Sequence, residues 1–331
     1  MSETPLHELR TSRLVPAPVE RALNAALTRG PGYEPLPLGT AFDGRTVSGY
    51  YLDFRAKTTS PATSDPARLL PAAHVQLALG WWERHVAGED GALERFLDLC
   101  AGVERRGEPA GGELRWPIGA AVPKYRLAPG WCSALVQGQA ASMFARARLA
   151  TGEARFGELA AAAAEPLLAD GGSDLVTRTG SGPILEEAPS EPPSHVLNGW
   201  VFALWGLWDL GTGLDHGRAR AAFDDGVRCL RAHLPAYDTG RWTLYSLYPH
   251  ALPDLAKPFY HRLHADQMTA LARLGGGSEL DEAARRWASY DRPANVALAV
   301  AQKAAFALAD GRRRRRWRGR QTADSSLRSK R

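Results

Sequence analysis

One pattern recurs along the chain and limits the folds open to it: an apolar helical segment, a short glycine-containing turn, and a second helical segment. The four copies lie at 66–87 with 91–106, 131–150 with 154–168, 195–210 with 217–234, and 261–274 with 279–290. Repeats of one supersecondary unit indicate stacked hairpins that share a continuous core. We therefore predict a mainly α fold, an incomplete α/α toroid of about four helical hairpins. Its functional cleft would lie at the helix ends and long loops.

Differences in composition and periodicity divide the chain into four segments. Residues 1–65 are rich in proline, glycine, serine and threonine, and the alternating stretch 46–54 predicts short strands. The helical repeats occupy 66–292, and a terminal helix is predicted at 293–310. Residues 311–331 contain ten lysines and arginines and one aspartate, so we predict a basic disordered tail there.

Charge and targeting signals exclude several classes of protein. The formal net charge is +5, but the tail alone contributes +9, so residues 1–310 carry about −4. A body that is mildly acidic does not indicate a nucleic-acid-binding surface. The three cysteines form no CxxC pair, which predicts reduced thiols. The N-terminus has no apolar signal-peptide core, and no apolar run is long enough to span a membrane, so we predict a cytoplasmic protein.

Signatures of cofactor and metal chemistry are absent from the sequence. There is no phosphate-binding GxxxxGK[ST] motif, no HExxH, no GxSxG and no Cys/His spacing typical of zinc. We therefore predict no cofactor and no metal. The remaining possibilities are acid–base chemistry by side chains, or binding alone.

The candidate side chains for such chemistry lie mostly in the three long loops 107–130, 169–194 and 235–260. Glu186 and Glu187 are adjacent in a proline-rich loop before a helix, a position also typical of a solvated acidic pair. Aromatic and imidazole groups follow in the last loop and the next helix, where structural roles are equally typical. These are Tyr245, Tyr260, His261 and His264.

Four segments resemble the C-terminal domain of D-glucuronyl C5-epimerases. They are GWCSALVQGQAASMFARA at 130–147, ILEEAPSEPPSHVLNGWVFALWGLWDL at 184–210, YDTGRWTLYSL at 237–247 and YHRLHADQMTAL at 260–271. The blocks occur in the family's order, within roughly 115–290. Such enzymes convert glucuronate to iduronate in heparan-type chains. The resemblance implies an α/α barrel, a cofactor-independent isomerase and a partner that is a uronic-acid-containing polysaccharide such as heparosan or heparan sulfate.

The resemblance also implies roles for single residues. Glu187 corresponds to the family's acid/base carboxylate, and Tyr245 and Tyr260 correspond to active-site tyrosines. Asn198, Lys257 and His264 correspond to substrate-contacting positions of the family. Further substrate-binding candidates lie in the long loops and at helix ends. They are Lys124, Arg126, Trp131, Glu186 and His261. Two positions depart from the family pattern, because Ala188 replaces a third tyrosine and Tyr248 replaces an arginine.

Inversion at C5 of a uronate requires removal of a proton alpha to a carboxylate and its return on the other face. Two acid/base groups must therefore flank the sugar ring. We predict that Glu187 has a pKa raised by burial and that Tyr260 has a pKa below its ordinary value of about 10. Lys257, Asn198 and His264 would stabilise the enediolate. A uronan lyase and a non-catalytic uronan-binding module remain alternatives. The oligomeric state is open, with a homodimer as one option.

Overall fold

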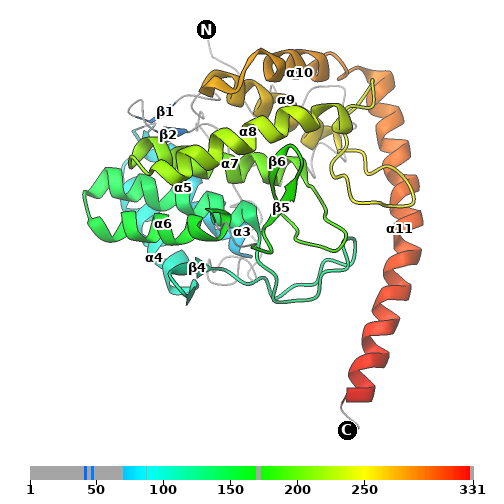
Figure 1. The fold of residues 1–331 in the computed structure, drawn as a ribbon, viewed down its shortest axis with the longest axis horizontal. Helices are drawn as coiled ribbons and strands as arrows, with labels where there is room; N and C mark the ends of the chain where they lie inside the picture. Colours follow the sequence, from blue (N-terminus) through cyan, green and yellow to red (C-terminus); the bar gives the residue numbers. More distant parts are fainter. Residues whose placement is uncertain (1–40, 43–45, 48–69, 87, 169–172, 329–331) are drawn as a thin grey trace.

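Helices make up most of the part of the chain that the structure describes (Figure 1). The computed structural model describes residues 41–42, 46–47, 70–86, 88–168 and 173–328. The helices are α3 (Pro71–Val86), α4 (Ala92–Arg105), α5 (Ala134–Thr151), α6 (Ala154–Leu168), α7 (Leu197–Gly213), α8 (Gly217–Tyr237), α9 (Pro258–Leu271), the π-helical η3 (Ala272–Gly276), α10 (Ser278–Ala288) and α11 (Pro293–Arg328). The prediction of a mainly α fold is confirmed.

The strands are short and form three antiparallel pairs. They are β1 (Ala41–Phe42), β2 (Thr46–Val47), β3 (Glu108–Ala110), β4 (Glu113–Arg115), β5 (Val176–Thr179) and β6 (Gly182–Leu185). The predicted strand at 46–54 begins as β2, and the rest of that stretch lies outside the described residues. Pairs β3–β4 and β5–β6 lie in long loops for which the sequence analysis predicted no strands.

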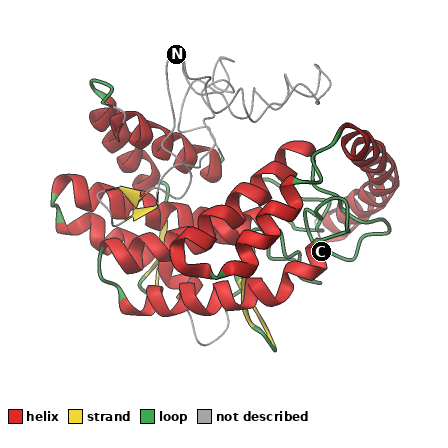
Figure 2. Cartoon of the chain, turned by 90° about the horizontal axis from the view of Figure 1, so that it is seen from above, coloured by secondary structure: helices red, strands yellow, loops and turns green. Residues whose placement is uncertain are grey.

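The four predicted pairs of helices are present, and the two members of each pair pack against each other. The first helices of successive pairs also contact one another in chain order, α3 with α5, α5 with α7 and α7 with α9. The second helices also contact one another in chain order, α6 with α8 and α8 with α10. Figure 2 shows the stacked helices from above. The long loops gather at one end of this array, so side chains far apart in the sequence can meet there.

Proline and glycine mark the ends of these helices. Pro71, Pro258 and Pro293 each occupy the first position of a helix, where the missing N–H would have no intrahelical partner. Gly152 follows α5 with φ of 75°, in the left-handed region that favours glycine, and its N–H bonds to the carbonyl of Arg148. The turn residues of the repeat therefore set the helix boundaries.

Helices α5 and α7 form the centre of the fold. Every residue of α5 from Ala134 to Ala147 is buried, and so is every residue of α7 from Leu197 to Leu207. A helix that is buried on all sides is typical of a core helix rather than a surface one. Trp200 in α7 is fully buried in this core.

The two central helices approach each other at glycine residues. A Cβ atom built on Gly206 would lie 1.9 Å from the carbonyl oxygen of Gly138, and one built on Gly138 would lie 2.5 Å from the Cα of Ala203. Both contacts are with backbone, which cannot rotate away. Close to this contact, buried Arg146 of α5 forms an ion pair with buried Asp209 of α7. The α5–α7 contact thus depends on small residues and on one buried charge pair.

The C-terminal helix differs from the prediction. A helix at 293–310 and a disordered tail from 311 were expected, whereas α11 continues without interruption to Arg328. Arginine and alanine have high helix propensity, and no proline follows Pro293 to end the helix. The second half of α11 extends away from the other helices (Figure 1).

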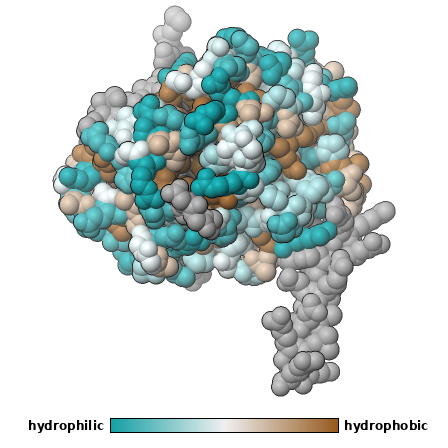
Figure 3. Space-filling view, in the orientation of Figure 1, coloured by the Kyte–Doolittle hydropathy of each residue, from teal (hydrophilic) through white to brown (hydrophobic). Residues whose placement is uncertain are grey.

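The face shown in Figure 3 is mostly hydrophilic, with small hydrophobic patches between polar residues. Large hydrophobic side chains that are exposed are scattered, as is normal for a protein surface. Examples are Leu252 and Leu298. Within the described residues, no helix combines the length and apolar character needed to cross a membrane.

We predict that Gly206→Ala destabilises the protein by at least about 2 kcal/mol, because the added methyl group overlaps the backbone of α5. Gly157→Ala is the matched control, since the nearest atoms to its Cβ would lie 3.8 Å away. In α6 that change replaces a poor helix former with a good one and should stabilise by about 0.5–1 kcal/mol. Urea unfolding of both variants measures the two effects. Equal stabilities for Gly206→Ala and the parent would show that α5 and α7 separate without cost.

Candidate active site

The three long loops and the first turns of α7 and α9 bring polar and charged side chains to one region. A cavity of about 390 Å³ lies there, within the size range of about 300–1,000 Å³ typical of ligand pockets. Its lining residues are Lys124, Tyr245, Lys257, Tyr260, Lys303, Phe306 and Ala307. Four of these were predicted as site residues, and the other three come from α11, which was not expected to contribute.

Glu187 lies beside this cavity with its carboxylate held by two neighbours. The side-chain amide of Asn198 donates to Oε2 at 3.3 Å, and the hydroxyl of Tyr245 also hydrogen-bonds the carboxylate. Burial raises the pKa of Glu187 to about 7, even though Lys124 and these two hydrogen bonds lower it. The predicted raised pKa is confirmed, so this carboxyl group can exchange a proton near neutral pH.

Gly199 makes the position of Glu187 possible. A Cβ atom on Gly199 would lie 2.4 Å from Cβ of Glu187 and 2.2 Å from its Oε2. Contacts below 3.0 Å are not tolerated, so any larger residue at 199 would displace the glutamate. Because Asn198 and Gly199 are consecutive in the first turn of α7, one turn of helix both hydrogen-bonds Glu187 and leaves space for it.

Tyr245 and Tyr260 contact each other, with ring centroids 4.9 Å apart and ring planes at 68°. Burial and the charge of Glu187 raise the pKa of Tyr260 to about 12, although a hydrogen bond with Tyr245 lowers it. The pKa of Tyr245 is raised well above its ordinary value, for the same two main reasons. The prediction of a lowered tyrosine pKa is therefore wrong, because an apolar setting beside a carboxylate disfavours the phenolate.

Two lysines share one buried aspartate at the cavity. Lys124 forms an ion pair with one carboxylate oxygen of Asp254, and Lys303 forms an ion pair with the other. Burial lowers the pKa of Lys124 to about 8; Asp254 opposes this effect and Lys303 adds to it. Burial alone would raise the pKa of Asp254, but the two lysines outweigh burial and hold it below its ordinary value. The cavity is thus positively charged at this end.

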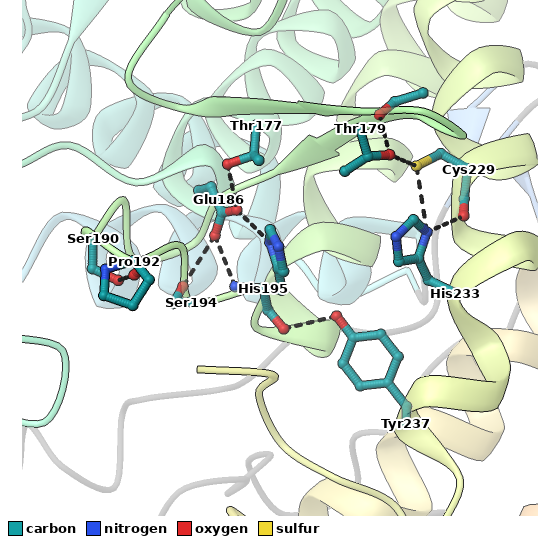
Figure 4. Close-up of polar contacts among 11 residues, drawn as sticks. Thr177, Thr179, Glu186, Ser190, Pro192, Ser194, His195, Cys229, His233 and Tyr237 are labelled. Carbon is teal, nitrogen blue, oxygen red and sulfur yellow. Dashed lines mark hydrogen bonds and ion pairs between the residues drawn. The ribbon is translucent and has the colours of Figure 1, made fainter. Parts of the chain in front are cut away.

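The side chain of Glu186 points toward Thr177, Ser194 and His195 (Figure 4). Its carboxylate accepts from the hydroxyls of Thr177 and Ser194 and from the backbone N–H of His195, and it pairs with the His195 ring at 2.6 Å. It is 1% exposed and does not line the cavity. The hydroxyl of Tyr237 donates to the His195 carbonyl and extends this frame. The geometry shows Glu186 holding the loop in place.

His261 and His264 are fully buried residues of α9. Both rings hydrogen-bond the hydroxyl of Thr243, and His261 also pairs with the carbonyl of Trp287 and stacks on Trp242 at 3.7 Å. Burial lowers the pKa of His261 to about 4 and that of His264 well below its ordinary range. Both imidazoles are therefore neutral at pH 7. Neither lines the cavity, although Nε2 of His264 has no hydrogen-bond partner among the described residues.

The other predicted substrate-binding residues differ in position. Lys257 is exposed at the start of α9 and lines the cavity. Arg126 is exposed in the loop between β4 and α5, and the indole of Trp131, in the same loop, donates to the carbonyl of Ala120 at 2.9 Å. Neither Arg126 nor Trp131 lines the cavity. Of these three residues, only Lys257 lines the cavity together with Lys124.

The two departures from the family pattern lie in one cluster. Ala188 and Tyr248 are both buried and pack together with Tyr125 and Val196. The rings of Tyr125 and Tyr248 meet edge to face, with centroids 5.4 Å apart. Aromatic side chains therefore fill the space around the small alanine. The two substitutions are in contact with the same group of residues and are expected to depend on each other.

The described residues contain no group of three or more histidine, cysteine, aspartate or glutamate side chains that could hold a metal ion. The groups that converge on the cavity are two carboxylates, two phenols and three ammonium groups. This set can transfer protons and bind an anion.

We predict that Glu187→Gln stabilises the folded protein by roughly 1–3 kcal/mol above pH 7, because it removes a partly buried carboxylate whose ionisation costs free energy. A pKa raised in the folded state means that stability falls as pH rises from about 4.5 to about 7. The two proteins should therefore be equally stable at pH 4.5, and the variant should be the more stable at pH 8. Urea unfolding at both pH values measures this. A variant that is less stable at pH 8 would contradict the raised pKa.

Comparisons with known proteins show which family the chain belongs to. Residues 112–289 match the family described as D-glucuronyl C5-epimerase C-terminus. The chain is 31% identical over 204 residues to the D-glucuronyl C5-epimerase of Caenorhabditis elegans, covering 57% of this chain and 33% of that protein. It is 28% identical over 177 residues to an uncharacterized protein of Methanocaldococcus jannaschii, covering 52% of this chain and 56% of that protein.

The match covers only part of these relatives, a third of the first and just over half of the second. Within this chain, however, the matched region is more than half of the sequence and contains Lys124, Glu187, Tyr245, Lys257 and Tyr260. The expected family is confirmed: this chain belongs to the D-glucuronyl C5-epimerase C-terminus family.

Proposed function

We propose that this protein inverts C5 of glucuronate units in a polysaccharide. The observation that carries the proposal is Glu187, a carboxyl group with a pKa of about 7 that lies against Tyr245 and beside a cavity rich in lysine. Proton removal alpha to a carboxylate needs a base of this kind and a cation for the substrate carboxylate. The family and the name of the Caenorhabditis elegans relative support glucuronate as the sugar.

In the proposed reaction, ionised Glu187 removes the C5 proton from one face of the ring. The phenol of Tyr260, which stays protonated because its pKa is about 12, donates a proton to the other face. The bond from C5 to its first hydrogen breaks and a bond to a new hydrogen forms, with no net gain or loss of protons. Tyr245 hydrogen-bonds both groups, so it can return a proton from Glu187 to Tyr260 after each turnover.

The intermediate is an enediolate with a second negative charge on the substrate carboxyl group. Lys124 and Lys257 are the predicted cations that line the cavity, and we propose that they stabilise this charge. Asn198 positions Glu187 through its amide. His264 is neutral, so we propose that it acts as a hydrogen-bonding residue and not as a cation. Glu186 and His261 would position the site from behind, without contact with the sugar.

The proposed substrate is a heparosan-type chain, in which glucuronate alternates with a glucosamine unit, and heparan sulfate is its modified form. We also propose that the hairpin stack is part of an incomplete α/α toroid. Its long loops would then surround one sugar unit while the polymer continues on both sides. Arg126 and Trp131, on the loop before α5, could contact those flanking units.

The decisive experiment is incubation of the protein with heparosan in deuterated water. We expect deuterium at C5 of the uronate and the appearance of iduronate, both measured by NMR. A lyase would instead produce an unsaturated uronate with a new ultraviolet absorbance. Binding without exchange would indicate a non-catalytic module and would contradict the proposal.

We predict that Glu187→Gln and Tyr260→Phe each lower the rate of C5 exchange by about 10²–10⁴, the usual contribution of a positioned acid/base group. Both changes preserve side-chain volume, so affinity for heparosan oligosaccharides should stay close to that of the parent. Tyr245→Phe removes the hydroxyl that returns a proton from Glu187 to Tyr260. It should therefore lower the rate of repeated turnover more than the rate of the first exchange.

Gly157→Ala, in α6 and outside the site, is the matched control for these variants and should exchange at the parent rate. If Tyr260→Phe keeps most of the exchange activity, the assignment of the second acid/base group is wrong. Tyr245 would then be the candidate for that role.

A further inference from the structure

Helix α11 begins at Pro293, after the last residue that matches the family, yet it contributes to the cavity wall. Its buried positions recur at intervals of three and four residues. Val296, Ala299, Phe306 and Asp310 are all buried, and Lys303 occupies the position between Ala299 and Phe306 in this series. A lysine in the middle of a core-facing stripe is unusual and needs a partner or a function.

Lys303 is held in place by several contacts. Its ammonium group pairs with Asp254, donates to the carbonyl of Leu255 at 2.8 Å and lies 4.9 Å from the ring centroid of Phe306. It is also 5.7 Å from the ring centroid of Tyr245, and the ammonium group of Lys124 lies 4.5 Å from the same centroid. The two ammonium groups therefore lie on the same side of the active-site tyrosine.

The charges at this end of the cavity do not balance. Lys124, Lys257 and Lys303 line the cavity, and the carboxylates beside them are Asp254 and Glu187, so one positive charge is in excess even when Glu187 is ionised. Asp254 is fully buried, and the Lys124 and Lys303 side chains that pair with it are 15% and 21% exposed. An ammonium group has three N–H donors. Among the described residues, the hydrogen-bond partners of Lys124 and Lys303 leave three of the six N–H groups available for a ligand. One excess positive charge and three donors suit a carboxylate, which has about four acceptor positions.

We propose that Lys303 binds the carboxylate of the uronate whose C5 is inverted, so that the C-terminal helix forms part of the substrate site. This inference rests on the proposed function. The carboxyl carbon is bonded directly to C5, so an anion held by Lys303 and Lys124 places C5 next to Tyr245 and its contact Tyr260. The same two cations would stabilise the second negative charge of the enediolate. Asp254 keeps both ammonium groups in position without neutralising them fully.

A purely structural role for Lys303, as an anchor of α11 on Asp254, makes a different prediction. Loss of an anchor would weaken binding of any sugar at the cavity, charged or neutral. Loss of a carboxylate-binding residue would weaken only the binding of the charged one. Comparing the two ligands therefore separates the roles.

The experiment uses the full chain and titration calorimetry with two probes, a heparosan octasaccharide and the same octasaccharide after reduction of its carboxyl groups to alcohols. The variants are Lys303→Met, which keeps the aliphatic packing, and Lys303→Arg, which keeps the charge. Gln302→Met is the control, since Gln302 is the exposed neighbour on the same helix. Circular dichroism and thermal unfolding check that each variant is folded.

We expect Lys303→Met to lose about tenfold or more in affinity for the octasaccharide, the usual cost of a lost hydrogen bond to a charged group. Its affinity for the reduced octasaccharide should equal that of the parent, and Lys303→Arg and Gln302→Met should retain most of the affinity for the charged probe. An unchanged affinity in Lys303→Met, or an equal loss on both probes, would overturn the inference and leave the proposed function intact. A folded parent protein that binds neither probe would overturn both.

Discussion

The close approach of α5 and α7 is the constraint on which the rest of the structure depends. Gly138 and Gly206 allow the two backbones to touch, and this contact fixes the axis of α7 in the core. The first turn of α7 then presents Asn198 and Gly199 to the preceding loop. There the amide binds the Glu187 carboxylate and the missing side chain of Gly199 leaves space for it. A packing contact between helices thus determines where the Glu187 carboxylate lies.

Burial explains why this region can transfer protons at neutral pH. The same loss of hydration raises the pKa of Glu187 to about 7 and lowers that of Lys124 to about 8, so both groups change charge close to neutrality. Asp254 responds differently, because two lysines outweigh its burial and keep it ionised. Tyr260 stays protonated beside Glu187. Burial at one site therefore gives the groups that the proposed reaction needs: a base, a proton donor and cations for the substrate carboxylate.

The sequence predicts the helical pairs well, because glycine turns and apolar periodicity are local signals. Through the family resemblance, the sequence also identifies Glu187, Tyr245 and Tyr260. The structure brings these three residues together. Without the resemblance, the sequence could not tell Glu186 from Glu187, since neighbouring carboxylates differ only in the direction that the folded loop gives them. The pKa of Tyr260 was predicted in the wrong direction because it depends on burial. Asp254 and Lys303 were missed: a single aspartate in a loop has no pattern, although a lysine in the apolar stripe of residues 296–310 is a signal that could have been recognised.

The central claim is that a uronate lies with its C5 between the side chain at position 187 and the hydroxyl of Tyr260. A crystal structure of the Glu187→Gln variant with a bound heparosan oligosaccharide tests it most directly. The account predicts a glucuronate ring in the cavity, with the amide of residue 187 and the Tyr260 hydroxyl facing C5 from opposite sides. A sugar bound elsewhere, or both groups on one face of the ring, would contradict it.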